Sequence, residues 1–174
     1  MPAMGWLVGF VAVVVAVATY LTWIAARVDR LHHRVAAAHS ALDAQLVRRA
    51  AAAVTLAELD GSLGDRADGL RQTAIAALRS VNDGREVAEN QLTRTLRGLR
   101  GYGPDSEADG PAGRALAEVV SASRRVELAR QVHTDLVRET LAARRRPVVR
   151  MLGLDRRHRR PAYFDIEDPV LDGA

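Results

Sequence analysis

The sequence predicts an all-α protein in which a single N-terminal transmembrane helix continues into an up-and-down four-helix bundle with long first and last helices. Three observations carry this prediction. Residues 6–26 form an apolar run without a charge. The chain beyond them is rich in Ala, Leu and Arg, which favour helices, and poor in aromatic residues. Apolar residues recur there at three- and four-residue steps, the spacing that buries one face of a helix.

The apolar run at residues 6–26 is long enough to cross a bilayer, since a helix of this length extends roughly 30 Å. Trp6, Tyr20 and Trp23 lie near its ends, where amphipathic rings prefer the lipid headgroups. A cleaved signal peptide is the alternative. However, no Arg or Lys precedes the run, and the run continues past the small residues at 16–18. We therefore predict a retained anchor.

The charges on either side of the run predict its orientation in the cell membrane. The N-terminal flank, residues 1–5, carries only the α-amino charge, whereas Arg27, Arg30 and Arg34 follow the run. Positively charged flanks are retained on the cytoplasmic side. The N-terminus is therefore expected outside the cell and the helical domain in the cytoplasm.

The chain divides by sequence into an anchor at 1–26, a helical domain at 27–168 and a disordered C-terminus at 169–174. Gly, Asn, Asp and Pro clusters mark the ends of the helices because these residues favour turns. The first helix has no such break between the anchor and its end. The expected helices span about 27–59, 65–81, 84–100 and 111–146, followed by a tail at 147–168.

The residue types present argue against catalysis. The chain has no Cys, which excludes disulfides, thiolate metal sites and Cys nucleophiles. His39 and Asp43 lie one helical turn apart and could share a metal, but such a pair is more typical of a solvated helix surface. No catalytic motif or phosphate loop is present. We predict no enzymatic activity and no cofactor; a metal-dependent membrane enzyme is the weaker alternative.

All 25 basic residues are Arg, and they concentrate after the last expected helix. In an up-and-down bundle this helix ends beside the start of the first, so these side chains are expected to contact anionic lipid headgroups. One alternative is that they complement the helix dipole. Another is nucleic-acid binding, which is disfavoured because no aromatic residue stands among them. The segment contains Arg144, Arg145, Arg146, Arg150, Arg156, Arg157, Arg159 and Arg160.

Four segments in a fixed order give the chain a family resemblance. They are ALDAQLVRRA at 41–50, AENQL at 88–92, RRVELARQVHTDLVRE at 124–139 and PAYFDIED at 161–168. Their order and spacing resemble those of the LemA family of bacterial membrane proteins. The positions that match the family segments are Gln45, Arg48, Arg49, Glu89, Asn90, Leu92, Arg125, Arg130, Arg138, Tyr163 and Phe164.

The resemblance implies a four-helix bundle on one membrane anchor and implies no activity. The chain departs from the family where a Pro-containing segment would follow Arg49. It departs again where Val132-His133 and Glu139-Thr140 replace two Tyr-Asn pairs, which would alter any contact made by those pairs. We expect the matching polar residues to satisfy hydrogen bonds across the core rather than to bind a ligand.

These patterns together predict a non-enzymatic membrane protein that presents its helices for self-assembly or for protein partners. The expected partners are the lipid bilayer and either further copies of the chain or another membrane protein. Tyr163 and Phe164, which are among the few aromatic residues outside the anchor, are expected to pack against the end of the bundle.

Overall fold

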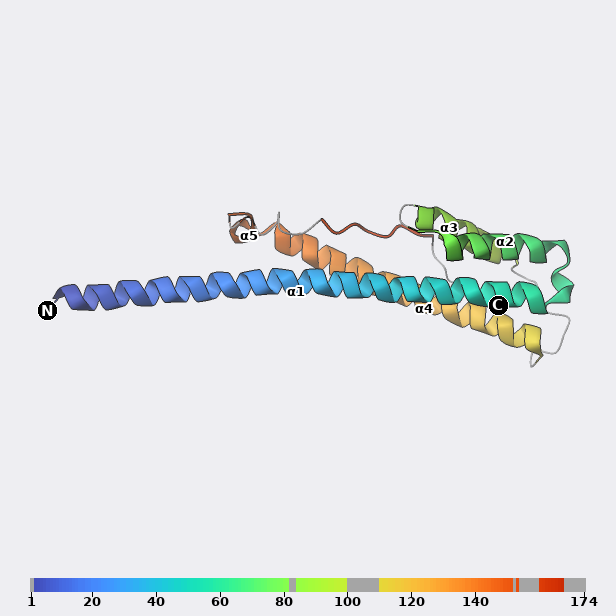
Figure 1. Cartoon of the computed structure of the whole chain (residues 1–174), viewed down its shortest axis with the longest axis horizontal. Helices are drawn as coiled ribbons and strands as arrows, with labels where there is room; N and C mark the ends of the chain where they lie inside the picture. Colours follow the sequence, from blue (N-terminus) through green and yellow to red (C-terminus); the bar gives the residue numbers. More distant parts are fainter. Residues whose placement is uncertain (1, 82–83, 100–109, 152, 154–159, 168–174) are drawn as a thin grey trace. The chain divides into compact units, whose positions relative to one another are not determined.

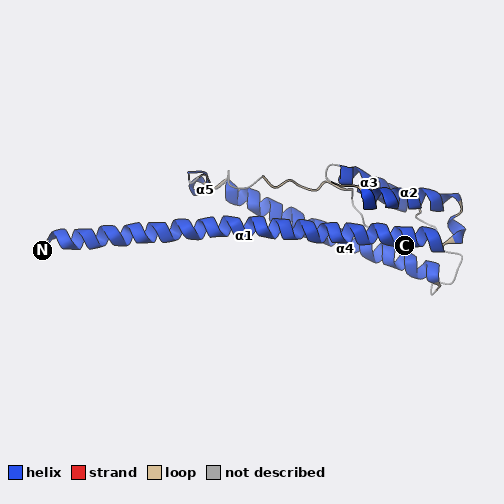
Figure 2. Cartoon of the chain, viewed as in Figure 1, coloured by secondary structure: helices blue, strands red, loops and turns tan. Residues whose placement is uncertain are grey.

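The structure, a computed structural model, describes residues 2–81, 84–99, 110–151, 153 and 160–167. Within these ranges all regular structure is helical and there is no strand (Figures 1 and 2). The elements are α1 (Pro2–Leu59), the 3-10 helix η1 (Gly61–Leu63), α2 (Asp65–Arg79), α3 (Gly84–Arg97), α4 (Pro111–Arg144) and α5 (Pro147–Met151).

The long helix α1 is uninterrupted because no Gly or Pro stands between Gly9 and Gly61. Part of it is long and apolar enough to cross a membrane, with a mean hydropathy of 2.3 over its most apolar window. Thr19 and Thr22 donate their hydroxyls to carbonyls one turn earlier, at 2.8 Å each. Apart from the hydroxyl of Tyr20, these are the only hydroxyl groups near the end of the apolar run, and both are hydrogen-bonded within the helix.

Contacts within the chain divide it into two compact units, which are described separately below. The first unit comprises Met1–Ala37 and Asp135–Ala162, and the second comprises 38–134 with 163–174. Both α1 and α4 therefore contribute to each unit. Within the first unit, Ile24 and Val28 of α1 pack with Val149 of α5.

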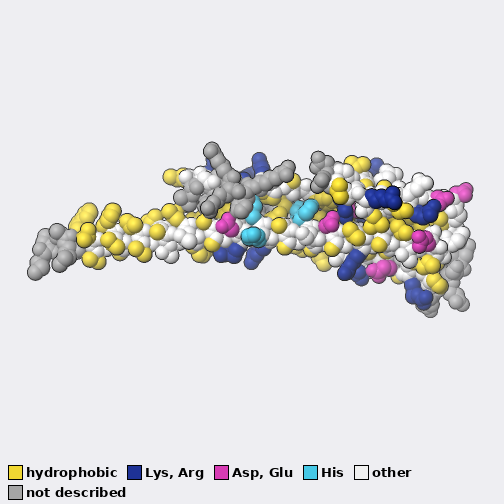
Figure 3. All heavy atoms as spheres, viewed as in Figure 1, with side chains coloured by type: hydrophobic (Ala, Val, Ile, Leu, Met, Phe, Trp, Pro, Cys, Tyr) yellow, Lys and Arg dark blue, Asp and Glu magenta, His cyan; other side chains and the backbone are white. Residues whose placement is uncertain are grey.

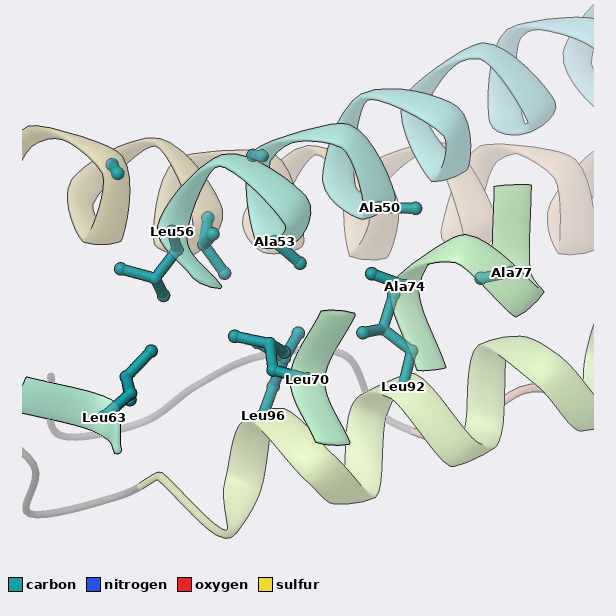
Figure 4. Close-up of a cluster of buried hydrophobic side chains, with 12 residues drawn as sticks. Ala50, Ala53, Leu56, Leu63, Leu70, Ala74, Ala77, Leu92 and Leu96 are labelled. Atoms are coloured by element: carbon teal, nitrogen blue, oxygen red, sulfur yellow. The ribbon is translucent and has the colours of Figure 1, made fainter. Parts of the chain in front are cut away.

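The second unit contains the larger hydrophobic core, to which α1, η1, α2, α3 and α4 all contribute. Leu side chains fill it, and Ala residues on α1 and α2 allow the helices to approach closely. Figure 4 shows Leu56, Leu70, Leu92 and Leu96 in this cluster together with the small side chains of Ala53 and Ala74. Val119 adds a buried side chain from α4.

The break between α1 and α2 is built from the residues that the sequence marks as a turn. The carboxylate of Asp60 accepts a hydrogen bond from the backbone N–H of Ser62 at 3.1 Å, which caps η1. Gly64 follows with φ of +52°, in the region that favours glycine. Asp65 and Asp68 then begin α2, where negative charge is favourable beside the helix N-terminus.

The C-terminal part departs from the expected pattern of one long helix and a tail. Helix α4 ends at Arg144, two residues early, and Pro147 begins a further short helix rather than only stopping the previous one. Proline suits a first helical position because it has no N–H to leave unpaired. Val149 of α5 is buried with Ile24 and Val28 in the core of the first unit. Residues 100–109, between the third and fourth expected helices, lie outside the described residues, as does the C-terminus at 169–174.

Candidate functional site

The N-terminal part of α1 presents an apolar surface that no other described residue of the first unit covers. Every residue from Gly5 to Tyr20 is exposed, and Trp6 is 81% exposed. Figure 3 shows hydrophobic side chains along the N-terminal part of α1. Trp23 is 52% exposed, and Ile24 is the first buried side chain of α1. Uncovered apolar area on this scale marks a surface that meets lipid or a partner rather than water.

Two stacked aromatic rings and an Arg mark the end of this apolar surface. The rings of Tyr20 and Trp23 lie 6.4 Å apart with an interplanar angle of 20°. The guanidinium carbon of Arg27 lies 5.8 Å from the centre of the Trp23 ring, within the range of a cation–π interaction. The end of the run thus combines amphipathic rings with a positive charge, as at a membrane–water interface.

The turn between α4 and α5 packs against this same end of the apolar surface. Val149 is buried against Ile24 and Val28, and half-buried Val148 packs at the edge of the cluster. Arg146, from the turn before α5, lines a groove together with Trp23 at this end of the apolar run. A groove of about 190 Å³ lies between the two segments.

The Arg-rich segment forms a second hollow in the same unit. Its volume is about 260 Å³, and among the described residues its lining consists of Leu141 and four Arg residues. Four guanidinium groups around one hollow suit phosphate or carboxylate groups, which Arg binds in bidentate fashion. The lining Arg residues are Arg144, Arg145, Arg150 and Arg160. Arg156, Arg157 and Arg159, which the sequence analysis placed at the same surface, lie outside the described residues.

A buried ion pair joins α1 to α3 in the second unit. Arg49 Nη2 lies 2.7 Å from Glu89 Oε2, and both side chains are fully buried. The same Nη2 also donates to the backbone carbonyl of Glu89 at 3.3 Å. Thr93 donates its hydroxyl to that carbonyl at 2.9 Å. Both ion-pair residues belong to the family-like segments, and their contact joins two helices of the core.

Arg85 and Asp43 extend this ion pair toward the surface. Arg85 Nη2 lies 3.0 Å from Asp43 Oδ1, and Arg85 Nη1 donates to the carbonyl of Ser80 at 3.1 Å. Arg85 Nε lies 3.7 Å from Glu89 Oε1. Burial raises the pKa of the Glu89 carboxyl, while the positive charges of Arg49 and Arg85 act in the opposite direction. Sequence reasoning missed Arg85, although its spacing of four residues before Glu89 was a usable signal.

The other family-like positions on α1 and α3 have varied surroundings. Gln45 is half-buried, and its side-chain oxygen has no hydrogen-bond partner within the described part of the chain. Arg48 is exposed, whereas Leu92 lies in the main core. Asn90 binds the C-terminal tail, as described below. These positions therefore do not converge on one site.

The three family-like Arg residues of α4 form ion pairs on their own helix. Arg125 lies 3.4 Å from Glu118, Arg130 lies 2.8 Å from Glu127, and Arg138 lies 3.1 Å from Asp135. Arg125 and Arg138 are exposed, and Arg130 is half-buried. Pairs of this kind contribute little to stability, about 0.3–0.5 kcal/mol when they are exposed.

Residues 163–167 of the C-terminal tail pack within the second unit through alternate residues. Ile166 is buried with Leu42, Leu46 and Val126, and Phe164 packs against this cluster. Tyr163 is 50% exposed, so the prediction that both aromatic residues pack inward is wrong for Tyr163. Phe164 packs against residues of α1 and α4, as the prediction requires of an inward-facing side chain.

Polar bonds to α3 hold the same tail. Glu167 N donates to Asn90 Oδ1 at 2.7 Å, and Asp165 N donates to Glu86 Oε1 at 3.0 Å. Arg94 Nε donates to Glu167 Oε1 at 2.8 Å, and this bond lowers the pKa of the Glu167 carboxyl. Three side chains of one helix thus fix the tail in position.

A pair of His rings lies beside the tail. The ring centres of His39 and His133 are 5.5 Å apart, and the ring of His39 meets Phe164 edge-on at 6.2 Å. Burial lowers the pKa of His133, and the neighbouring His39 lowers it further. Asp43, one turn along α1 from His39, pairs with Arg85. Within the described residues no three or more His, Asp or Glu side chains gather in a way that could hold a metal.

No family model, curated protein or solved structure matches the chain. The resemblance to the LemA family therefore depends on the four sequence segments alone. In the first unit, two features have a clear chemical meaning. They are the uncovered apolar surface and the Arg residues beside its end.

Proposed function

We propose that this chain is a non-enzymatic, single-pass membrane protein whose helical domain serves self-assembly or protein partners. The observation that carries the proposal is the exposed apolar surface of α1, which is unbroken from Gly5 to Tyr20. Exposing apolar area to water costs about 25 cal/mol per Å². A bilayer removes that cost, and its hydrocarbon thickness matches a run of this length.

The positions of the Arg residues support the proposal that the helical domain is cytoplasmic and that its Arg-rich end lies at the membrane surface. Arg27, Arg30 and Arg34 follow the apolar run, and Arg146 lines a groove with Trp23 in the same unit. A basic residue near an anionic leaflet gains about 1 kcal/mol. The segment around Arg150 would thus hold the domain to the surface a second time.

The helical domain is proposed to be a divergent LemA-like up-and-down four-helix bundle. Contributions of α1, α2, α3 and α4 to one core support this architecture. Its role in assembly is supported by an apolar strip on α4, where Leu128 and Val132 lie one turn apart and are 63% and 49% exposed. Such a strip can pack against the same strip of a second copy.

Cysteine labelling tests the membrane topology, because the natural chain has no Cys and gives no background. We would compare Gly5→Cys with Val87→Cys, which replaces an exposed residue of α3. A membrane-impermeant maleimide should label Gly5→Cys on intact cells and Val87→Cys only after permeabilisation. Labelling of Val87→Cys on intact cells would reverse the orientation. Release of the chain from membranes by alkaline extraction would contradict the span itself.

A second candidate function is the binding of nucleic acid by the four-Arg hollow. No acidic residue lines it in the part of the chain that the structure describes, and this favours a polyanion. A gel shift with the full chain at physiological salt tests it, with Arg145→Ser and Arg150→Ser combined as the variant. Binding that disappears in this variant would support the candidate, whereas no shift by the unmodified chain would exclude it.

A further inference from the structure

The groove between the end of the apolar run and the α4–α5 turn is apolar inside. Its volume is about 190 Å³, and the buried cluster of Ile24, Val28 and Val149 adjoins it. The apolar and aromatic residues that line it come from both segments. They include Tyr20, Trp23, Ile24, Val28, Pro147 and Val148.

Two positive charges complete the lining of this groove. Arg27 comes from α1 and Arg146 from the turn before α5, and no Asp or Glu is among the lining residues that the structure describes. Within the described residues neither Arg forms an ion pair with a carboxylate. Stacking on Trp23 restrains the Arg27 guanidinium at the edge of the groove.

From this combination we infer that the groove binds one anionic phospholipid of the surrounding bilayer. The phosphate would lie between Arg27 and Arg146, and the first part of an acyl chain would lie along Trp23 and Val148. An apolar cleft with two guanidinium groups at its edge complements a molecule with a negative head and a hydrocarbon chain. Guanidinium groups bind phosphate oxygens in bidentate fashion.

The position of the groove along α1 agrees with this occupant. It lies at the end of the apolar run, where Tyr20 and Trp23 mark the level of the headgroups. The inference rests on the proposed function, because a bilayer lipid reaches the groove only if residues 6–26 cross the membrane. It goes beyond that function by assigning a stoichiometric site in place of diffuse attraction between Arg residues and a charged leaflet.

Lipid retention by the full chain tests the site. The protein would be purified in a neutral detergent and titrated with phosphatidylglycerol or with phosphatidylcholine of the same acyl chains, and bound lipids would be counted by native mass spectrometry. One phosphatidylglycerol should be retained, at least tenfold more tightly than phosphatidylcholine. Glycerol phosphate, which has the head without the chains, should not displace it. Displacement by glycerol phosphate would overturn the proposal by showing a plain anion site.

Two charge-matched variants separate the groove from diffuse attraction. Arg27→Gln with Arg146→Gln removes two charges from the groove, and Arg144→Gln with Arg145→Gln removes two from the neighbouring hollow. Only the first variant should lose the retained lipid. Equal loss in both would overturn the site and leave membrane attachment intact, and the cysteine-labelling result reports on attachment independently.

A third variant guards against misfolding as the cause of the loss. Val148→Glu keeps both groove Arg residues and places a carboxylate among the apolar lining. It should abolish phosphatidylglycerol retention while the helical circular dichroism signal remains that of the unmodified chain. Unchanged retention in Val148→Glu would overturn the proposed occupation of the groove.

Discussion

Arg49 on α1 and Glu89 on α3 form an ion pair at 2.7 Å in which neither side chain has any exposed surface. Removing two charges from water is costly, and their attraction in the core offsets the cost only when the geometry is good. Two nitrogens of Arg49 and one oxygen of Glu89 have no hydrogen-bond partner within the described residues. The pair therefore indicates that the register between the two helices is fixed. It is weaker evidence for high stability.

Glu89→Leu should destabilise the second unit by about 3–5 kcal/mol, because it leaves the Arg49 charge buried without a partner. The double variant Arg49→Met with Glu89→Leu should recover most of this loss, since it leaves no unpaired charge. Thermal unfolding of the full chain in detergent, followed by circular dichroism, measures both. A double variant less stable than either single variant would show that the pair contributes net stability.

The C-terminal tail should contribute to stability through Phe164 and Ile166 but not through Tyr163. Ile166→Ala is expected to cost about 2–5 kcal/mol and Phe164→Ala about 1.5–3 kcal/mol, because both remove buried apolar area. Tyr163→Ala is the matched control, since its ring is half exposed. The same unfolding measurement applies, and equal effects of Tyr163→Ala and Phe164→Ala would contradict the observed packing.

His133 should make the second unit less stable in mild acid. Its pKa in the folded chain lies below the ordinary value of about 6.5, so the unfolded chain binds the proton more readily. Above about pH 6.5 the neutral ring contributes fully to the free energy of unfolding. This contribution is lost as the pH falls through the folded pKa, by up to about 1.4 kcal/mol per pH unit.

A variant isolates this pH dependence from that of the other groups. His133→Gln should give a flatter dependence of the unfolding free energy on pH between about 5 and 7. Identical slopes in His133→Gln and the unmodified chain would exclude this residue as the source.

Self-association should depend on the apolar strip of α4. Leu128→Asp with Val132→Asp places two charges on a surface that is exposed within one copy, so the fold should tolerate it. If copies pack through this strip, the variant should shift the detergent-solubilised protein to monomers in mass photometry. Val87→Asp, at an exposed apolar site on α3, is the control. An unchanged mass in the double variant would exclude the strip as the interface.

Local sequence patterns predict the helices well because their causes are local. The apolar run and the absence of Gly and Pro account for α1, and Asp60 with Gly61 and Gly64 accounts for its end. Pro147 shows the limit of such reasoning, because a Pro can equally end one helix or begin the next. The contact of Val149 with α1, more than a hundred residues away in sequence, stabilises the second outcome.

The candidate site shows the same division between local and distant causes. The partner of Arg85 is Asp43, on another helix, and nothing in the sequence around either residue indicates the pairing. In the tail, Tyr163 was predicted to be buried because its side chain is aromatic. The alternation of an extended segment instead turns Phe164 and Ile166 inward and Tyr163 outward.

The burial of Val149 against Ile24 and Val28 makes α5 part of the anchor's end. A membrane-spanning helix adjusts its tilt to the thickness of the bilayer around it. In the proposed setting α5 would follow that tilt, and its neighbouring Arg146 and Arg150 would rise or sink relative to the lipid phosphates. The thickness of the membrane, as well as its charge, would then determine how firmly the basic segment is held.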